Sequence, residues 1–140
     1  MKMRVKLLSE HAVIPYKAYE TDLGFDLRSI SQVSLDPGAW TLVCTGVAIG
    51  FPKGYGGIIK DRSSVASNRG MFVHAGVIDN DYIGEIKILM YNGSSKLQHI
   101  NRGEKIAQLV LTPVVQCDIL EVDDLEDTER SDGGFGSTGE

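Results

Sequence analysis

The strongest constraint on the fold is that apolar residues come in short segments in which apolar and polar positions alternate. Turn-forming sequences such as Asp36-Pro37-Gly38, Asn92-Gly93 and Arg102-Gly103 separate these segments. Glycine supplies 16 of the 140 residues, above the usual ~7%, as many tight turns would require. Because alternation places every second side chain on one face of a strand, the pattern predicts an all-β fold, a β-sandwich or jelly roll.

Ten segments are predicted to be strands, and one short segment is predicted to be a helix. The longest strand, Trp40 to Ile49, alternates along its whole length. The helix is predicted over Ser64 to Arg69, with Ser63 or Ser64 placed to cap it. The strands are predicted over residues 3–8, 25–29, 32–35, 40–49, 55–60, 71–74, 85–92, 97–100, 105–111 and 114–121.

Length and composition indicate one ordinary globular domain. The chain is 42% apolar, and its longest apolar runs fall far short of the ~20 residues of a membrane span, so we expect no membrane association. The first ten residues lack the apolar stretch of a signal peptide. A net charge of -5 argues against a broad nucleic-acid surface. Cys44 and Cys117 lack the spacing of a metal or redox motif and are predicted to be small buried residues.

The C-terminal part of the chain differs in character from the rest. Residues 123–129 are mostly acidic, and residues 133–139 are rich in glycine around a single aromatic residue, Phe135. Such a sequence cannot bury much of itself. We therefore expect a β domain over residues 1–122 and a flexible arm over residues 123–140, which composition alone would leave as a disordered terminus.

The segment from Gly76 to Ile86 carries the most concentrated polar chemistry. Val77 and Ile78 favour an extended conformation, residues 79–81 are turn formers, and Glu85 begins an alternating strand. The pattern predicts a hairpin that presents Asp79 and its neighbours from a fixed bend. Taken alone, this segment is more typical of an ordinary polar turn, because Asp and Asn are common in turns for conformational reasons.

Five segments in order resemble the five motifs of the trimeric dUTP pyrophosphatases. The third is the segment just described, and the first and second contain Phe25-Asp26-Leu27 and Arg62-Ser63-Ser64. The five segments are residues 18–29, 57–66, 76–85, 102–110 and 130–139. This resemblance implies an all-β, distorted jelly roll of the β-clip type with one short helix, assembled as a homotrimer that hydrolyses dUTP.

The resemblance implies a group of residues that bind the triphosphate. Arg62, Ser63 and Ser64 match the family segment that holds the phosphates, and Gln108 matches a polar residue near them. Asp26 matches the carboxylate that faces the water shell of Mg²⁺, the expected cofactor. Magnesium keeps most of its water and is usually held by few carboxylates together with substrate phosphates, so no preformed cage is expected.

A second group is implied to bind the nucleoside. Asp79 is expected to bond the deoxyribose 3′-hydroxyl and to activate the attacking water, while the ring of Tyr82 lies beneath the sugar and excludes ribonucleotides. The backbone of Gly76, Val77 and Ile78 is expected to read uracil. Glu85 and Lys87, from the strand predicted over residues 85–92, complete the predicted substrate-binding set.

The fifth motif is implied to close over the site of a neighbouring subunit. Arg130 would contact phosphate, Phe135 would stack on the base, and Gly136 and Ser137 belong to the same binding segment. The family commonly has Arg-Gly at the start of this motif, whereas this chain has Arg130-Ser131-Asp132. The family also often has an Asn shortly before the catalytic Asp, and residues 71–75 contain none.

The expected reaction is Mg²⁺-assisted hydrolysis of dUTP to dUMP and pyrophosphate by water that Asp79 activates, which lowers dUTP and supplies dUMP for thymidylate synthesis. Two alternatives remain open at this point: a dCTP deaminase on the same fold, and a non-catalytic nucleotide sensor. Release of ammonia from dCTP would favour the first, and absence of pyrophosphate release from dUTP would favour the second. The cytoplasm is the expected location, with the nucleus left open.

Overall fold

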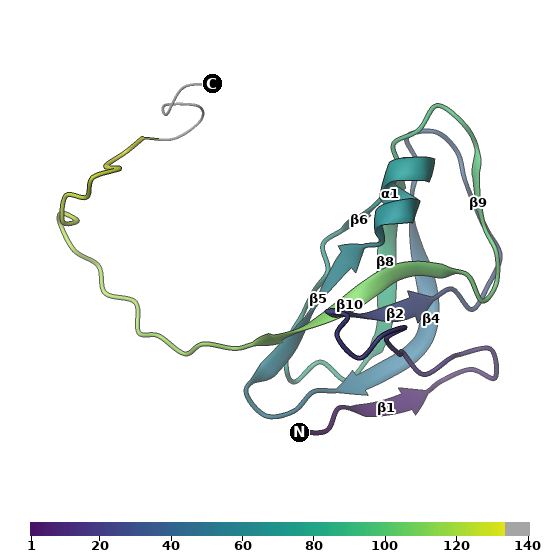
Figure 1. The fold of residues 1–140 in the computed structure, drawn as a ribbon, viewed down its shortest axis with the longest axis horizontal. Coiled ribbons are helices and arrows are strands. Elements are labelled where there is room, and N and C mark those ends of the chain that lie inside the picture. Colours follow the sequence, from purple (N-terminus) through teal and green to yellow (C-terminus); the bar gives the residue numbers. More distant parts are fainter. Residues whose placement is uncertain (134–140) are drawn as a thin grey trace.

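The structure is a computed structural model, and it describes residues 1–133 of the chain (Figure 1). It contains strands and one short helix, so the all-β prediction is confirmed. In chain order the elements are β1 (Arg4–Leu7), β2 (Gly24–Arg28), β3 (Val33–Leu35), β4 (Trp40–Gly50), β5 (Tyr55–Asp61), α1 (Ser63–Arg69), β6 (Met71–His74), β7 (Val77–Ile78), β8 (Glu85–Asn92), β9 (Gln98–Ile100) and β10 (Lys105–Pro113).

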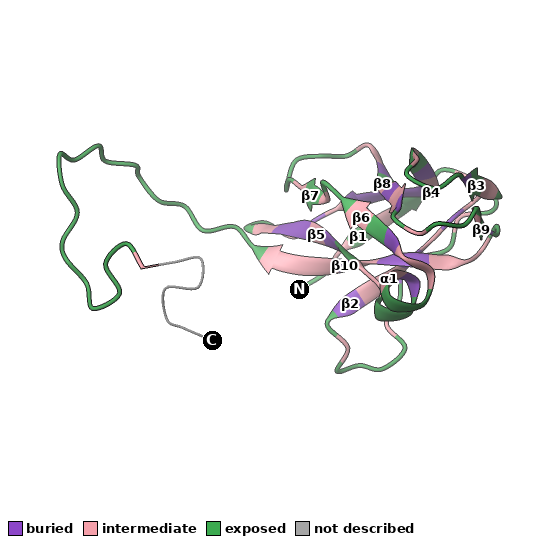
Figure 2. Cartoon of the chain, turned by 90° about the horizontal axis from the view of Figure 1, so that it is seen from above, coloured by how far each residue is buried: buried purple, intermediate pink, exposed green. Residues whose placement is uncertain are grey.

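The strands form two four-stranded sheets and one two-stranded ribbon. The first sheet has the order β1-β4-β8-β6, the second has the order β2-β10-β5-β7, and β3 pairs with β9. All pairs are antiparallel. Both sheets and the ribbon contribute side chains to one core, which appears as the purple segments inside the body in Figure 2. The core includes Leu27, Leu35, Val43, Val47, Ile59, Met71, Ile86, Ile88, Met90, Ile100, Ile106 and Leu109.

The predicted strands agree with the observed ones up to β10, and the strand predicted over residues 114–121 is wrong. The chain leaves the body after Pro113, where the Val114 amide donates a hydrogen bond to the Gly54 carbonyl at 2.8 Å. Ile119 is then 96% exposed. Alternation shows which residues would share a face, but a strand also needs a partner edge, and residues 114–121 pair with no strand in this structure. Residues 114–133 extend away from the sheets as an arm (Figures 1 and 2).

One face of the first sheet is apolar yet uncovered in the single chain. Register places Trp40 opposite Tyr91 and Leu42 opposite Leu89, and the next strand adds Phe72 and His74 on the same side. Trp40 is 51% and Leu42 59% exposed. The ring centroids of Trp40 lie 4.4 Å from His74 and 4.5 Å from Tyr91. We call this surface the outer face, defined by Trp40, Leu42, Phe72, His74, Leu89 and Tyr91.

The two cysteines are only partly as predicted. Cys44 is partly buried in β4, but Cys117 is exposed in the arm, so its predicted burial is wrong. The prediction failed because it rested on the strand that does not form. Over the described residues, no helix has the length and apolar character needed to cross a membrane.

Candidate functional site

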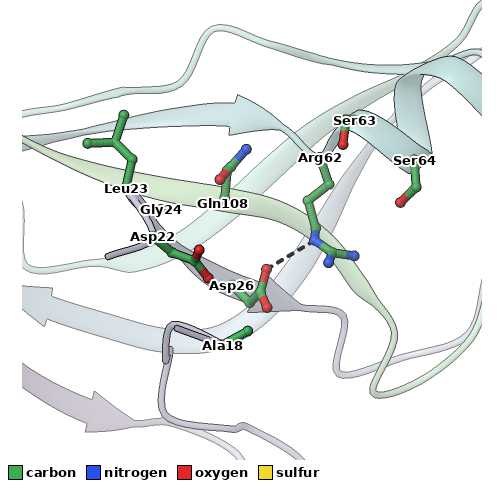
Figure 3. A pocket seen from close by; sticks show the side chains of 9 residues that line it. All are labelled: Ala18, Asp22, Leu23, Gly24, Asp26, Arg62, Ser63, Ser64 and Gln108. Carbon is green, nitrogen blue, oxygen red and sulfur yellow. Dashed lines mark ion pairs between the residues drawn. The ribbon is translucent and has the colours of Figure 1, made fainter. Parts of the chain in front are cut away.

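A polar cavity of about 250 Å³ lies where three regions of the chain meet. The loop before β2 forms one wall, β2 and β10 form the floor, and the start of α1 forms the opposite wall (Figure 3). We call it the Asp26 pocket. Its lining residues are Ala18, Asp22, Leu23, Gly24, Asp26, Arg62, Ser63, Ser64 and Gln108.

The Asp26 pocket therefore brings together the five residues that were predicted to face phosphate and magnesium. Register explains part of this, because Gln108 of β10 stands directly opposite Asp26 of β2. The Gln108 amide nitrogen donates to the Asp61 carbonyl at 2.8 Å, which ties it to the end of β5. A Cβ atom at Gly24 would lie 2.9 Å from the Cβ of Gln108, so the glycine allows this side chain to cross the strand.

Asp26 is held by two cations from different elements. The Arg62 Nε atom lies 3.0 Å from Asp26 Oδ1, and the Lys105 Nζ atom lies 2.6 Å from Asp26 Oδ2. The hydrogen bond to Asp26 raises the pKa of the Lys105 ammonium above its usual value. Beside it, a hydrogen bond from Arg28 lowers the pKa of the Tyr16 phenol. Two cations thus face the single carboxylate of Asp26, although the whole chain is acidic.

The beginning of α1 differs from the prediction that a serine caps it. The N-cap residue is Arg62, with extended backbone angles and no side-chain cap hydrogen bond. Ser63 and Ser64 occupy the first helical turn instead, and both line the Asp26 pocket. A cap prediction from sequence is accurate to one or two residues at best, and here the shift leaves both hydroxyls available to a ligand.

The pocket suits magnesium only as part of a nucleotide complex. Within residues 1–133, no group of three or more His, Cys, Asp or Glu side chains lies close enough to hold a metal ion. Asp26 and Asp22 are the carboxylates at the pocket, and both oxygens of Asp26 face cations. Two carboxylates are too few to hold Mg²⁺ by themselves. They suit a magnesium ion that keeps most of its water shell and binds chiefly to the phosphates of a nucleotide.

A second cavity of about 310 Å³ lies beside the loop that carries Asp79. We call it the Asp79 pocket. The hairpin predicted here is wrong, because β7 pairs with β5 in the second sheet, whereas β8 pairs with β4 and β6 in the first. The loop is a connection between sheets. The lining residues are Val77, Ile78, Asp79, Tyr82, Glu85 and Lys87.

Backbone contacts fix the shape of this loop. The Asn80 side-chain amide donates to the carbonyls of Pro52 at 2.8 Å and Tyr55 at 2.5 Å. The Tyr82 hydroxyl donates to the Glu85 carbonyl at 2.9 Å, and the ring lies over Gly84, where a Cβ atom would clash with it. Sequence reasoning treated Asn80 only as a turn former and missed its anchoring role, since its acceptors are remote in the sequence.

Gly76 and Glu85 both make contacts that shape the backbone around the Asp79 pocket. Gly76 does not line the pocket; it has a φ angle of 98° and its carbonyl accepts a hydrogen bond from the Ile59 amide at 2.7 Å. A Cβ atom at Gly76 would lie 2.9 Å from the Ile59 carbonyl oxygen. Glu85 Oε1 accepts from the Gly46 amide at 2.8 Å, which links the loop to an irregular point of β4. Both residues shape the backbone around the pocket.

The two pockets share no residue and lie at different ends of β5. β7, which leads to Asp79, pairs with β5 at Gly57 and Ile58, whereas Arg62 follows the other end of that strand. Extended chain from Gly57 to Arg62 spans roughly 17 Å. The single chain therefore does not bring the two predicted groups into one cavity.

Of the predicted tail residues, the structure describes Arg130. The Arg130 Nε atom donates to the Gly133 carbonyl at 2.9 Å, a contact within the arm itself. Arg130 lines neither the Asp26 pocket nor the Asp79 pocket. Phe135, Gly136 and Ser137 lie outside the described residues.

Curated relatives match along nearly the whole chain. Deoxyuridine 5′-triphosphate nucleotidohydrolase of Nautilia profundicola is 48% identical, with 99% of each chain covered. The enzyme of the same name from Paramecium bursaria Chlorella virus 1 is 43% identical, with 96% of each chain covered.

Solved structures agree with these sequence matches. A mutant dUTPase of Staphylococcus bacteriophage 80alpha, solved with dUpNHpp, superposes with a TM-score of 0.89 at 30% identity, covering 99% of this chain and 98% of the other. A mutant phage phi11 dUTPase, described with a structural Mg(II) ion, has a TM-score of 0.82 at 29% identity and covers 91% of this chain and 100% of the other. The family model described as dUTPase matches residues 10–139. The chain therefore belongs to the dUTPase family of enzymes.

Proposed function

We propose that this protein hydrolyses dUTP to dUMP and pyrophosphate, and that it does so as a homotrimer with a β-clip type of jelly roll. The observation that carries the proposal is the pair of complementary pockets: one is polar and offers the Arg62 guanidinium and two serine hydroxyls, and the other is partly apolar with a single aspartate at its rim. A triphosphate suits the first and a nucleoside suits the second. The activity lowers dUTP and supplies dUMP for thymidylate synthesis, and we place it in the cytoplasm, with the nucleus left open.

In the Asp26 pocket, Arg62, Ser63 and Ser64 bind phosphate oxygens. A guanidinium pairs with phosphate through two parallel hydrogen bonds, and hydroxyls of the first helical turn add donors beside it. The amide of Gln108 supplies a further polar contact. Asp26 accepts hydrogen bonds from the water shell of Mg²⁺, which when bound neutralises phosphate charge.

In the Asp79 pocket, the nucleoside is bound by backbone and ring. The main chain of Gly76, Val77 and Ile78 reads uracil, and the Tyr82 ring excludes a 2′-hydroxyl. Glu85 and Lys87 line the far side of this pocket. Asp79 bonds the 3′-hydroxyl and accepts a proton from water as the water oxygen adds to phosphorus, the bond between the α- and β-phosphates breaks, and pyrophosphate leaves.

The separation of the pockets supports assembly from more than one copy, because a second copy is needed to place an Asp79 pocket against an Asp26 pocket. Three copies are what the family resemblance implies. The outer face is the contact surface we propose. Lys87 of the Asp79 pocket continues the same row of side chains as Leu89 and Tyr91 along β8, so coverage of the outer face closes the edge of that pocket. Burying such an apolar face is the main driving force for association. The arm then brings Arg130 and Phe135 of one copy to the site of another.

The first experiment measures pyrophosphate release from dUTP, with the four standard deoxynucleotides and UTP as controls. We expect release from dUTP alone, dependent on Mg²⁺. Ammonia from dCTP would point instead to a deaminase. Absence of pyrophosphate from dUTP, with nucleotide still bound, would contradict the proposed reaction.

Sharing of sites between copies is tested by complementation. Arg62→Met and Asp79→Asn are each expected to be inactive alone. When they are co-expressed, random assembly places the intact Arg62 of one variant beside the intact Asp79 of the other in about one quarter of the sites. We expect about that fraction of wild-type activity. The matched control pairs Arg62→Met with the double variant, which offers no intact combination. Equal inactivity of both mixtures would show that each site lies within one chain.

A further inference from the structure

Lys105 contacts Asp26 because of a specific irregularity in β10. Lys105 and Gln108 are three residues apart, so on a regular strand their side chains would point to opposite faces. The pairing with β2 shifts register between Lys105 and Ala107. This bulge inserts Ile106, which is fully buried, and turns both Lys105 and Gln108 toward the side of Asp26.

The two cations on Asp26 are held very differently. Lys105 Nζ also lies 5.0 Å from the centre of the Tyr16 ring, and the Tyr16 carbonyl accepts the Asp26 amide hydrogen bond at 2.9 Å. Lys105 thus lies between a ring and a carboxylate, outside the cavity lining. Arg62 lines the cavity and, within residues 1–133, has Asp26 as its one ion-pair partner (Figure 3).

We propose that Lys105 is a positioning residue for Asp26, and that Arg62 is an exchangeable partner that leaves the carboxylate for phosphate. The inference rests on the proposed function. A guanidinium matches phosphate with two hydrogen bonds, so an arriving triphosphate competes directly for Arg62. Asp26 then loses one of its two counterions. Lys105 keeps the carboxylate oriented, so that it can accept hydrogen bonds from the water around magnesium.

The test separates binding of nucleotide from the effect of magnesium. Calorimetry with dUpNHpp, with and without Mg²⁺, compares wild type, Lys105→Met and Lys105→Arg. For Lys105→Met we expect the gain in affinity that Mg²⁺ provides to fall about tenfold, as loss of one charge-assisted hydrogen bond predicts, while metal-free affinity changes by less than about threefold. Lys105→Arg should restore most of the gain.

Lys60→Met is the matched control, since Lys60 stands opposite Gln108 on β5 and forms no ion pair with a described residue. It removes the same charge from the same sheet without contact to Asp26, and the Mg²⁺ effect should be unchanged. Sedimentation and thermal unfolding check the assembly of each variant.

If Mg²⁺ increased the affinity of Lys105→Met for dUpNHpp as much as it does for wild type, the inference would be overturned. Equal loss of affinity with and without Mg²⁺ would also overturn it, because Lys105 would then be an ordinary phosphate cation. If Lys105→Met and Lys105→Gln both fail to fold, the role is structural and the inference is wrong. Failure of the proposed function looks different, because wild type would then release no pyrophosphate from dUTP.

Discussion

The Asp26 pocket and the Asp79 pocket differ in how their functional groups are held. In the first, charged side chains from β2, β10 and the start of α1 are paired with one another, and Asp26 is largely enclosed. In the second, the backbone is anchored by Asn80, while Asp79 itself is exposed at the rim. The charged side chains of the Asp26 pocket are thus positioned by pairs within one chain, whereas the Asp79 pocket remains open in the single chain.

The largest expected effect concerns Asp79. Asp79→Asn keeps the size of the side chain and removes its basicity, so turnover should fall on the order of 1000-fold. Affinity for dUpNHpp should stay nearly constant, as calorimetry would measure. Arg62→Met is the counterpart in the other pocket, and there affinity should fall. If Asp79→Asn lost affinity instead of turnover, the two pockets would not divide the work as proposed.

Removal of residues 129–140 should have the next largest effect. Loss of the charged Arg130 contact and of closure over the nucleotide should lower kcat about 100-fold while weak binding remains. Steady-state kinetics measures this, and sedimentation should show an intact trimer, because the outer face is untouched. An unchanged kcat would assign the arm another role, and dissociation into single chains would mean that the arm, and not the outer face, joins the copies.

A smaller effect is expected for Tyr82→Ala, which opens the Asp79 pocket beneath the sugar. Discrimination between dUTP and UTP, measured as the ratio of kcat/KM values, should fall about tenfold. Tyr82→Phe is the control, since it keeps the ring and removes only the hydrogen bond to the Glu85 carbonyl. Equal exclusion of UTP by Tyr82→Ala would place the selective wall elsewhere.

Local pattern predicted the strands well, because alternation and turn residues are properties of adjacent positions. The prediction failed where the structure of a segment depends on pairing with residues far away in the sequence. The segment after Val77 was expected to fold back on itself, yet β7 pairs with β5 and β8 lies in the other sheet. The strand expected after Pro113 pairs with no edge in this structure. The bulge at Ile106 was also missed, because consecutive buried residues in a strand look like ordinary core.

The candidate site shows the same limit. Resemblance to a family supplied the residues of both pockets, and the structure gathers Asp26, Arg62 and Gln108 as expected. Sequence alone did not predict that Asp79 would lie in a separate cavity. Nor did it predict Lys105 or Asn80, whose roles depend on contacts with Asp26 and with the carbonyls of Pro52 and Tyr55.

The crossing of Gln108 over Gly24 links the mutational histories of two positions that are far apart in sequence. Any side chain at residue 24 would occupy space that the Gln108 side chain now fills. Alanine at residue 108 would remove the Oε1 and Cδ atoms, but its Cβ atom would still lie 2.9 Å from a Cβ atom at residue 24, and the hold on the Asp61 carbonyl would be lost. Only glycine at residue 108 would clear the space, so both positions should remain fixed among descendants of this sequence.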